Sequence, residues 1–202
     1  MSKGQRKRLG TAYHEAGHAV ADTVLGLHVT NVEIVRRKDT LGRSSSLGIL
    51  RYEGGSRREQ RSIARDAIIS AYAGVEAQRL VETPEVYADD ADRNNAFWLS
   101  RTYCVMPRNC SYVGDDSHVA YLERLRTEAK RLVRREWTKI EAVATELLAK
   151  RKLTGDRVRE ICARVTGGPM SPSIPLAETS QQWRRRRIAA AAARASTPTV
   201  HV

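Results

Sequence analysis

Near the N-terminus of this 202-residue chain stands the stretch Ala12-Tyr13-His14-Glu15-Ala16-Gly17-His18-Ala19-Val20. It contains the pattern His-Glu-x-x-His. On an α-helix of ~3.6 residues per turn, positions i and i+4 share one face, so His14 and His18 can direct their imidazoles at one point. Neutral imidazoles suit Zn²⁺, and Glu15 is placed to accept a proton from a water held there. The pattern therefore predicts a catalytic zinc site with one Zn²⁺ per chain.

The motif is expected to lie in a helix from about Leu9 to Leu25, because apolar residues recur there at helical spacing. Gly26 can end this helix, and the β-branched run from Val29 to Val35 predicts a strand. A second short strand is expected from Leu47 to Tyr52, after a loop that includes the serine run 44–46. These two strands would form a small β element beside the motif helix.

Helical periodicity dominates the rest of the chain. Helices are expected from a capping box of Ser56 and Glu59 to about Val81, from the acidic stretch 89–92 to about Tyr103, from Ser117 to about Lys152, and from Gly155 to about Val165. A bend between Arg135 and Thr138 is expected to divide the third of these, giving either an antiparallel pair or a helix and its continuation. The predicted fold class is mainly α with a small β element (α+β), built from the motif helix and a helical bundle.

The formal net charge of +12 is concentrated at the two ends of the chain. Residues 1–8 are predicted to form a loose basic arm and residues 9–166 a single folded domain. Residues 167–202, rich in Pro, Ser, Thr and Ala, are predicted to be a disordered tail. Its segment Trp183-Arg184-Arg185-Arg186-Arg187 could contact nucleic acid or an anionic surface, but the lack of interleaved aromatic residues favours a solvated tail.

Cys104, Cys110 and Cys162 are an odd number of cysteines with no C-x-x-C arrangement. They are expected to be reduced thiols of an intracellular protein and not a disulfide framework or a cysteine zinc site. No apolar run approaches the ~20 residues that a membrane span needs. A soluble, cytoplasmic protein without a membrane span is therefore expected.

A catalytic zinc site needs a third protein ligand. Among the other histidines, His201 lies in the tail, His28 lies just after the motif helix and is typical of a loop residue, and His118 is typical of a capping or surface residue. The acidic residues Asp89, Asp90 and Asp92 are better candidates, because any one of them could complete a His₂-carboxylate site. Such a cluster is also common at a solvated helix start, and the spacing alone leaves the choice among the three open.

From Ala12 to about Val165 the sequence resembles the peptidase domain of the FtsH family, membrane-anchored AAA zinc metalloproteases. The likeness rests on the stretch 12–20, on the strand Val-Thr-Asn-Val-Glu-Ile-Val, on the helix with Tyr72-Ala73-Gly74, and on the block from Arg131 to Gly155. The resemblance implies zinc ligation by His14, His18 and an Asp followed by Ala four residues on and Arg nine residues on. Asp92 fits, with Ala96 and Arg101 at those offsets, and Asp90 fits worse.

Two departures from the family are clear. Its Gly-Gly-Arg-Ala-Ala-Glu-Glu stretch is replaced here by residues 73–79, Ala-Gly-Val-Glu-Ala-Gln-Arg, so the polar contacts behind the metal ligands are expected to differ. The sequence also contains no G-x-x-x-x-G-K-[ST] phosphate-binding motif and no membrane span. The expected activity is therefore the peptidase half of such an enzyme without its ATP-driven unfoldase. Related proteases are hexameric, so a homo-oligomer is an option even though the ATPase ring is missing.

Two functions are compatible with these observations. The first is a zinc metalloendopeptidase in which Glu15 is the general base and then the proton donor to the leaving amine. Its substrates would be peptides or unfolded proteins, unless a separate ATPase delivers folded ones. The second is a catalytically silent, peptidase-like binding module whose basic termini contact nucleic acid or a partner protein. The complete His-Glu-x-x-His pattern favours the enzyme, since a purely structural metal site has no evident use for Glu15.

Overall fold

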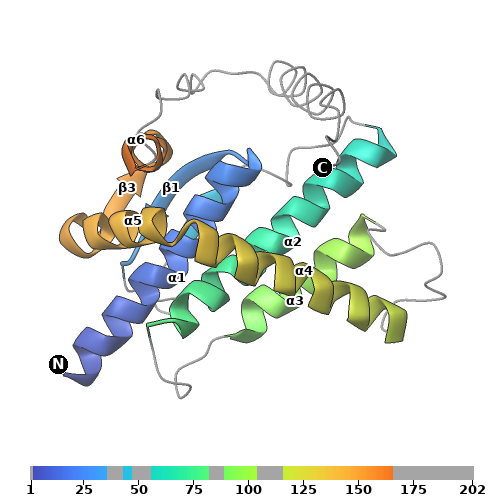
Figure 1. Ribbon diagram of the computed structural model, residues 1–202, viewed down its shortest axis with the longest axis horizontal. Coiled ribbons are helices and arrows are strands. Elements are labelled where there is room, and N and C mark those ends of the chain that lie inside the picture. Colours follow the sequence, from blue (N-terminus) through green and yellow to red (C-terminus); the bar gives the residue numbers. More distant parts are fainter. Residues whose placement is uncertain (1, 36–42, 47–55, 82–88, 104–115, 166–202) are drawn as a thin grey trace, which may run out of the picture.

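Helix α1 (Lys3–Leu25) carries the His-Glu-x-x-His motif and runs through the centre of the molecule (Figure 1). The computed structural model describes residues 2–35, 43–46, 56–81, 89–103 and 116–165. The other elements in these ranges are β1 (Val29–Glu33), β2 (Arg43–Ser46), α2 (Arg57–Arg79), α3 (Asp89–Thr102), α4 (Asp116–Arg135), α5 (Trp137–Lys150), β3 (Lys152–Thr154) and α6 (Gly155–Val165). The described part is mainly helical with a small antiparallel sheet, as the sequence predicts.

Local signals explain where α1 and α2 begin and end. The Ser2 hydroxyl accepts a hydrogen bond from the Gln5 amide, and the Gln5 side chain accepts one from the Ser2 amide, which caps the start of α1. Residues 3–8, expected to be a loose arm, are therefore the first turns of this helix. Gly26 ends α1 in the left-handed conformation, with φ of 73°, as predicted. The predicted capping box of Ser56 and Glu59 is confirmed at the start of α2.

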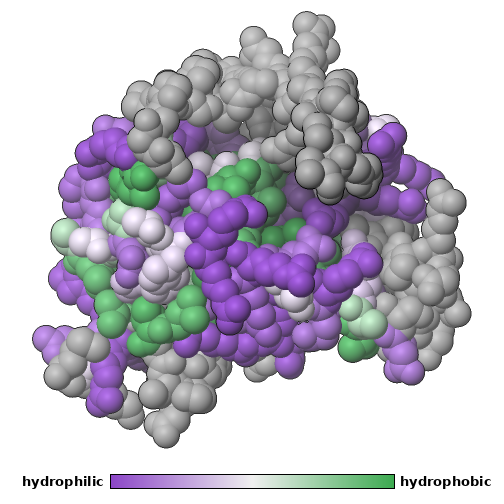
Figure 2. Space-filling view, in the orientation of Figure 1, coloured by the Kyte–Doolittle hydropathy of each residue, from purple (hydrophilic) through white to green (hydrophobic). Residues whose placement is uncertain are grey.

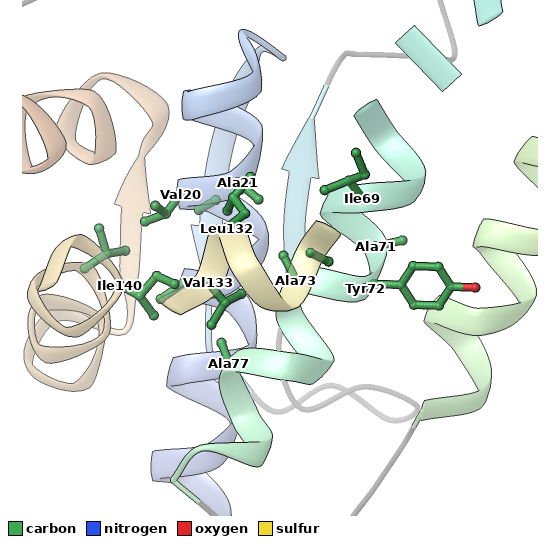
Figure 3. Packing of buried hydrophobic residues seen from close by; sticks show 14 of the residues in the cluster. Val20, Ala21, Ile69, Ala71, Tyr72, Ala73, Ala77, Leu132, Val133 and Ile140 are labelled. Carbon is green, nitrogen blue, oxygen red and sulfur yellow. The ribbon is translucent and has the colours of Figure 1, made fainter. Parts of the chain in front are cut away.

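Helices α1 and α2 pack side by side at very short range. A Cβ added at Gly17 would lie 2.7 Å from the Ala73 carbonyl oxygen and 2.8 Å from Ala77 Cβ, so only a glycine fits there. Figure 3 shows Ala21 on the side of α1 that faces α2, and Ala73 and Ala77 on the side of α2 that faces α1. Val20 points the other way, toward Ile140 of α5. The small residues Ala73, Gly74 and Ala77 of α2 allow this close approach to α1.

Helices α4 and α5 cross over the α1–α2 pair. The chain breaks its helical path at Glu136, within the predicted bend. Helix α4 packs on α2 while α5 packs on α1, so α5 continues beyond α4 and does not fold back onto it (Figure 1). Tyr13 stacks on Trp137 with ring centroids 5.3 Å apart, which fixes the start of α5 to the motif helix. The outward face of α4 is hydrophilic (Figure 2), whereas Leu125 and Val133 are buried beneath it.

The sheet has the order β2-β1-β3, and both pairings are antiparallel. It differs from the expectation in two places. Strand β2 occupies the serine run that was expected to be a loop, and the predicted strand from Leu47 to Tyr52 lies outside the described residues. Strand β3 was not foreseen, because three residues carry no readable periodicity and form a strand only by pairing with β1.

Several other expectations fall on residues outside the described ranges, including Cys104, Cys110, His201 and the tail 167–202. Cys162 lies in α6, where it is buried and not disulfide-bonded. Within the described ranges, no helix combines the length and the apolar character that crossing a membrane requires.

Candidate metal centre

The histidines of the motif direct their Nε2 atoms at the same point. His14 and His18 lie one turn apart on α1, and their Nε2 atoms are 3.1 Å from each other. Their rings meet edge to face, with centroids 4.7 Å apart and an interplanar angle of 82°. Both side chains are mostly buried, at 17% and 13% exposed. The i and i+4 spacing therefore produces the pair of converging imidazoles that the sequence predicts.

Asp92 comes to this pair from the first turn of α3. Its Oδ2 lies 3.1 Å from His14 Nε2 and 3.6 Å from His18 Nε2. The three residues form a group whose ligand atoms all lie within 4.8 Å of one another. The structure thus brings together the three residues expected to bind a metal, although 78 and 74 positions separate Asp92 from the two histidines in the sequence.

The donor set and its spacing fit Zn²⁺. Two imidazole nitrogens and one carboxylate oxygen are typical of a catalytic zinc site, which leaves the fourth position open. Ligands that bond one tetrahedral Zn²⁺ at about 2.0–2.2 Å lie roughly 3.3–3.6 Å from each other. The separations of 3.1, 3.1 and 3.6 Å among the three atoms agree with this value to a few tenths of an ångström. Without a metal ion, two nitrogen atoms and one oxygen atom this close together would have to share protons.

Contacts from α2 orient both imidazoles. His18 Nδ1 lies 2.8 Å from the Ser70 carbonyl oxygen, and His14 Nδ1 lies 3.0 Å from Gln78 Oε1. Because these oxygens can only accept, each Nδ1 must donate, which leaves each neutral Nε2 with its lone pair directed at the common point. An outer hydrogen bond of this kind fixes the tautomer and the orientation of a metal-binding histidine.

Glycine at position 74 gives His18 its space. A Cβ added at Gly74 would overlap the Nε2 atom and would lie 2.6 Å from Cε1 of that imidazole. The backbone of α2 therefore forms one wall of the candidate site, in direct contact with the His18 ring.

Glu15 is buried, with 6% of its surface exposed. It follows His14 directly on α1, and its carboxylate is close enough to raise the pKa of His18. A buried carboxylate beside two converging imidazoles is well placed to hold and move a proton at the site.

The charges of the candidate site shift the pKa values of His18 and Asp92. Burial lowers the pKa of His18, but the Asp92 carboxylate, then Glu15 and the Ser70 carbonyl, raise it to about 10 overall. Burial raises the pKa of Asp92, and the two imidazoles more than offset this, so the pKa of this carboxyl lies well below its usual range. The potential that retains a proton on a buried imidazole also favours a divalent cation.

The other candidates lie elsewhere or are not described. The side chains of Asp89 and Asp90 are outside the described set, so the choice of Asp92 over Asp90 as zinc ligand stays a prediction. His28 is not part of the three-residue group. His118 is fully buried, so its interpretation as a capping or surface residue is wrong.

Two residues of the site were missed in the sequence. Ser70 acts through its backbone carbonyl, which no side-chain pattern can reveal. Gln78 lies in the stretch 73–79 that departs from the FtsH-like pattern, and this departure was the signal that the contacts behind the ligands differ.

No protein-family model matches this chain, and the comparison with curated proteins finds no similar one. The likeness to FtsH-type peptidases therefore rests on the sequence motifs alone and stays a prediction.

Proposed function

We propose that this protein is a zinc-dependent metallopeptidase that hydrolyses peptide bonds in peptides or unfolded proteins. One observation carries the proposal: two histidines of a His-Glu-x-x-His helix and an aspartate from a distant helix converge with zinc-like spacing, beside a buried glutamate. A purely structural site would have no use for Glu15 in this position.

In this proposal His14, His18 and Asp92 hold the metal, and α2 keeps the two imidazoles in the required tautomer. When bound, Zn²⁺ acidifies a water molecule and polarises a carbonyl group. Glu15 accepts the proton of the attacking water and later passes it to the departing amine nitrogen, so that one carboxylate serves both steps. Its burial strengthens its electrostatic effect on neighbouring groups.

The substrate is proposed to be a flexible chain. These 202 residues carry no phosphate-binding motif of an ATPase, so ATP-driven unfolding of a folded substrate would have to come from outside them. Peptides and unfolded proteins need no such help. A separate ATPase is therefore an optional partner, while an extended peptide is the required one.

The test compares the purified chain with its Glu15→Gln variant. Zinc is measured by mass spectrometry of the metal, and hydrolysis is followed with fluorescently labelled casein, an unfolded protein. We expect about one zinc per chain in both proteins and a loss of activity of roughly 10²–10⁴-fold in the variant, the range for general acid–base catalysis. Glu123→Gln is the matched control, because Glu123 is 61% exposed on α4 and should leave activity unchanged. Stoichiometric zinc without any hydrolysis would overturn the enzymatic assignment.

A further inference from the structure

A fully buried Ser–His pair links the helix that carries Asp92 to α4. Ser100 of α3 and His118 of α4 are both 0% exposed, and Ser100 Oγ lies 2.9 Å from His118 Nε2. Ser100 Oγ also lies 2.7 Å from the Phe97 carbonyl oxygen. The single hydroxyl hydrogen is donated to that carbonyl, so His118 Nε2 must be the donor to Ser100. The Phe97 ring covers the imidazole at a centroid distance of 5.2 Å.

Ser100 lies on the same side of α3 as Asp92. Asp92, Ala96, Leu99 and Ser100 are spaced by four, three and one residues, so they fall on one face of the helix. Ala96 and Leu99 are buried, and α3 packs on α2, from which Tyr72 points toward α3 (Figure 3). At ~1.5 Å per residue, Ser100 stands roughly 12 Å along the helix axis from the metal ligand.

For Asp92 to reach a metal ion held by His14 and His18, the rotation of α3 about its own axis must be closely defined. A carboxylate at the surface of a helix lies roughly 5–6 Å from the axis, so a rotation of ~20° moves it by about 2 Å. That displacement equals a whole Zn–O bond of about 2.0–2.2 Å. Small apolar residues such as Ala96 allow a range of rotations, whereas a buried hydrogen bond has a direction and is costly to leave unmade.

We propose that His118 is a positioning residue for the metal site: through Ser100 it fixes the rotation of α3 that directs Asp92 at His14 and His18. This inference rests on the proposed function only in taking Asp92 as a metal ligand. It does not require the protein to be a peptidase. His118 touches neither metal nor substrate and acts through the helix that it holds.

The test measures metal affinity in variants of the full chain. His118→Phe keeps an aromatic ring but removes the donor, and Ser100→Ala removes the acceptor. Each is expected to weaken Zn²⁺ binding about tenfold in competition with a chromophoric chelator, the lower end of the range for groups that orient ligands. His118→Gln, which can present an amide donor, should recover part of the affinity. Circular dichroism establishes a temperature at which every variant is folded.

Two controls separate positioning from general stability. Ile161→Val, at a buried position in α6, should lower thermal stability while leaving zinc affinity unchanged. In an Asp92→Ala background, His118→Phe should cause no further loss of affinity, because its effect passes through that ligand. An equal loss with and without Asp92, or a fall in thermal stability with unchanged zinc affinity, would overturn the proposal.

Hydrogen exchange of the metal-free proteins gives a second readout. Amides in the first turns of α3 should exchange faster in His118→Phe than in wild type. In Ile161→Val, the ratio of their exchange rates to those of amides in the other helices should stay as in wild type. Unchanged exchange in His118→Phe would overturn the anchoring role even where no activity is found. The two proposals can also fail separately. If the wild type has no peptidase activity but His118→Phe still weakens zinc binding, the peptidase proposal is rejected and the positioning role of His118 stands.

Discussion

Gly74 of α2 lies directly against the imidazole of His18, with no room for a methyl group between them. Gly74→Ala should therefore displace His18, weaken zinc binding at least tenfold and lower the melting temperature, because a Cβ would overlap a ring held from behind by Ser70. Chelator competition and thermal unfolding measure the two effects. Gly4→Ala is the matched control: a Cβ there meets nothing within 4 Å, so this variant should be neutral or up to about 1 kcal/mol more stable. Equal zinc affinity in both variants would contradict the arrangement of α2 around His18.

Gln78 is predicted to tune the metal site through its contact with His14. Gln78→Ala removes the acceptor and should weaken zinc binding by about 10–100-fold. Gln78→Glu replaces the amide with a carboxylate, which makes the imidazole a stronger donor to the metal, and should tighten binding. Gln60→Ala, near the opposite end of α2, is the control. If Gln78→Glu bound zinc no better than Gln78→Ala, the contact would have no orienting role.

Zinc should stabilise the protein by joining α1 to α3. At a free zinc concentration 100 times the Kd, the gain in free energy of unfolding is about 2.7 kcal/mol. For a domain of this size that corresponds to a rise in Tm of roughly 5–10 °C. Asp92→Asn should remove most of this rise, whereas Asp156→Asn, on an exposed part of α6, should retain it. Differential scanning fluorimetry with zinc and with a chelator measures both, and an identical rise in the two variants would exclude Asp92 as a ligand.

Cys162 should resist alkylation in the folded protein. Burial raises the pKa of this thiol to about 11, so at pH 8 roughly one molecule in a thousand carries the reactive thiolate, against about one in ten for a thiol of pKa near 9. Mass spectrometry after treatment with iodoacetamide at pH 8 should find Cys162 unmodified until a denaturant is added. Rapid native modification of Cys162 would show that α6 does not pack as described.

Several helix ends were predictable because their signals are local. The capping box at Ser56 and the glycine that ends α1 act within a few residues of chain, so reading the sequence places them correctly. The break at Glu136 was predictable within a few residues from length alone. By contrast, the extension of α1 back to Lys3 depends on a second capping box at Ser2 that the charged composition of residues 1–8 obscured. Strand β3 exists only through its pairing with β1, a contact between residues about 120 positions apart.

The candidate metal centre likewise combines features that local sequence predicts with features that depend on tertiary packing. His14, Glu15 and His18 could be predicted as candidate site residues from the sequence, because their spacing and the pitch of one helix determine that the two imidazoles share a face. For the third ligand, the sequence left three acidic residues as candidates, and only the family resemblance favoured Asp92. The approach of its carboxylate to 3.1 Å from His14 depends on how α3 packs on α2 and on its buried link to α4. The Gln78 contact and the space left by Gly74 likewise depend on the distance between α1 and α2. The sequence by itself therefore determined the chemistry that one helix can present, and the tertiary structure decided what meets it, because those partners come from helices distant in the chain.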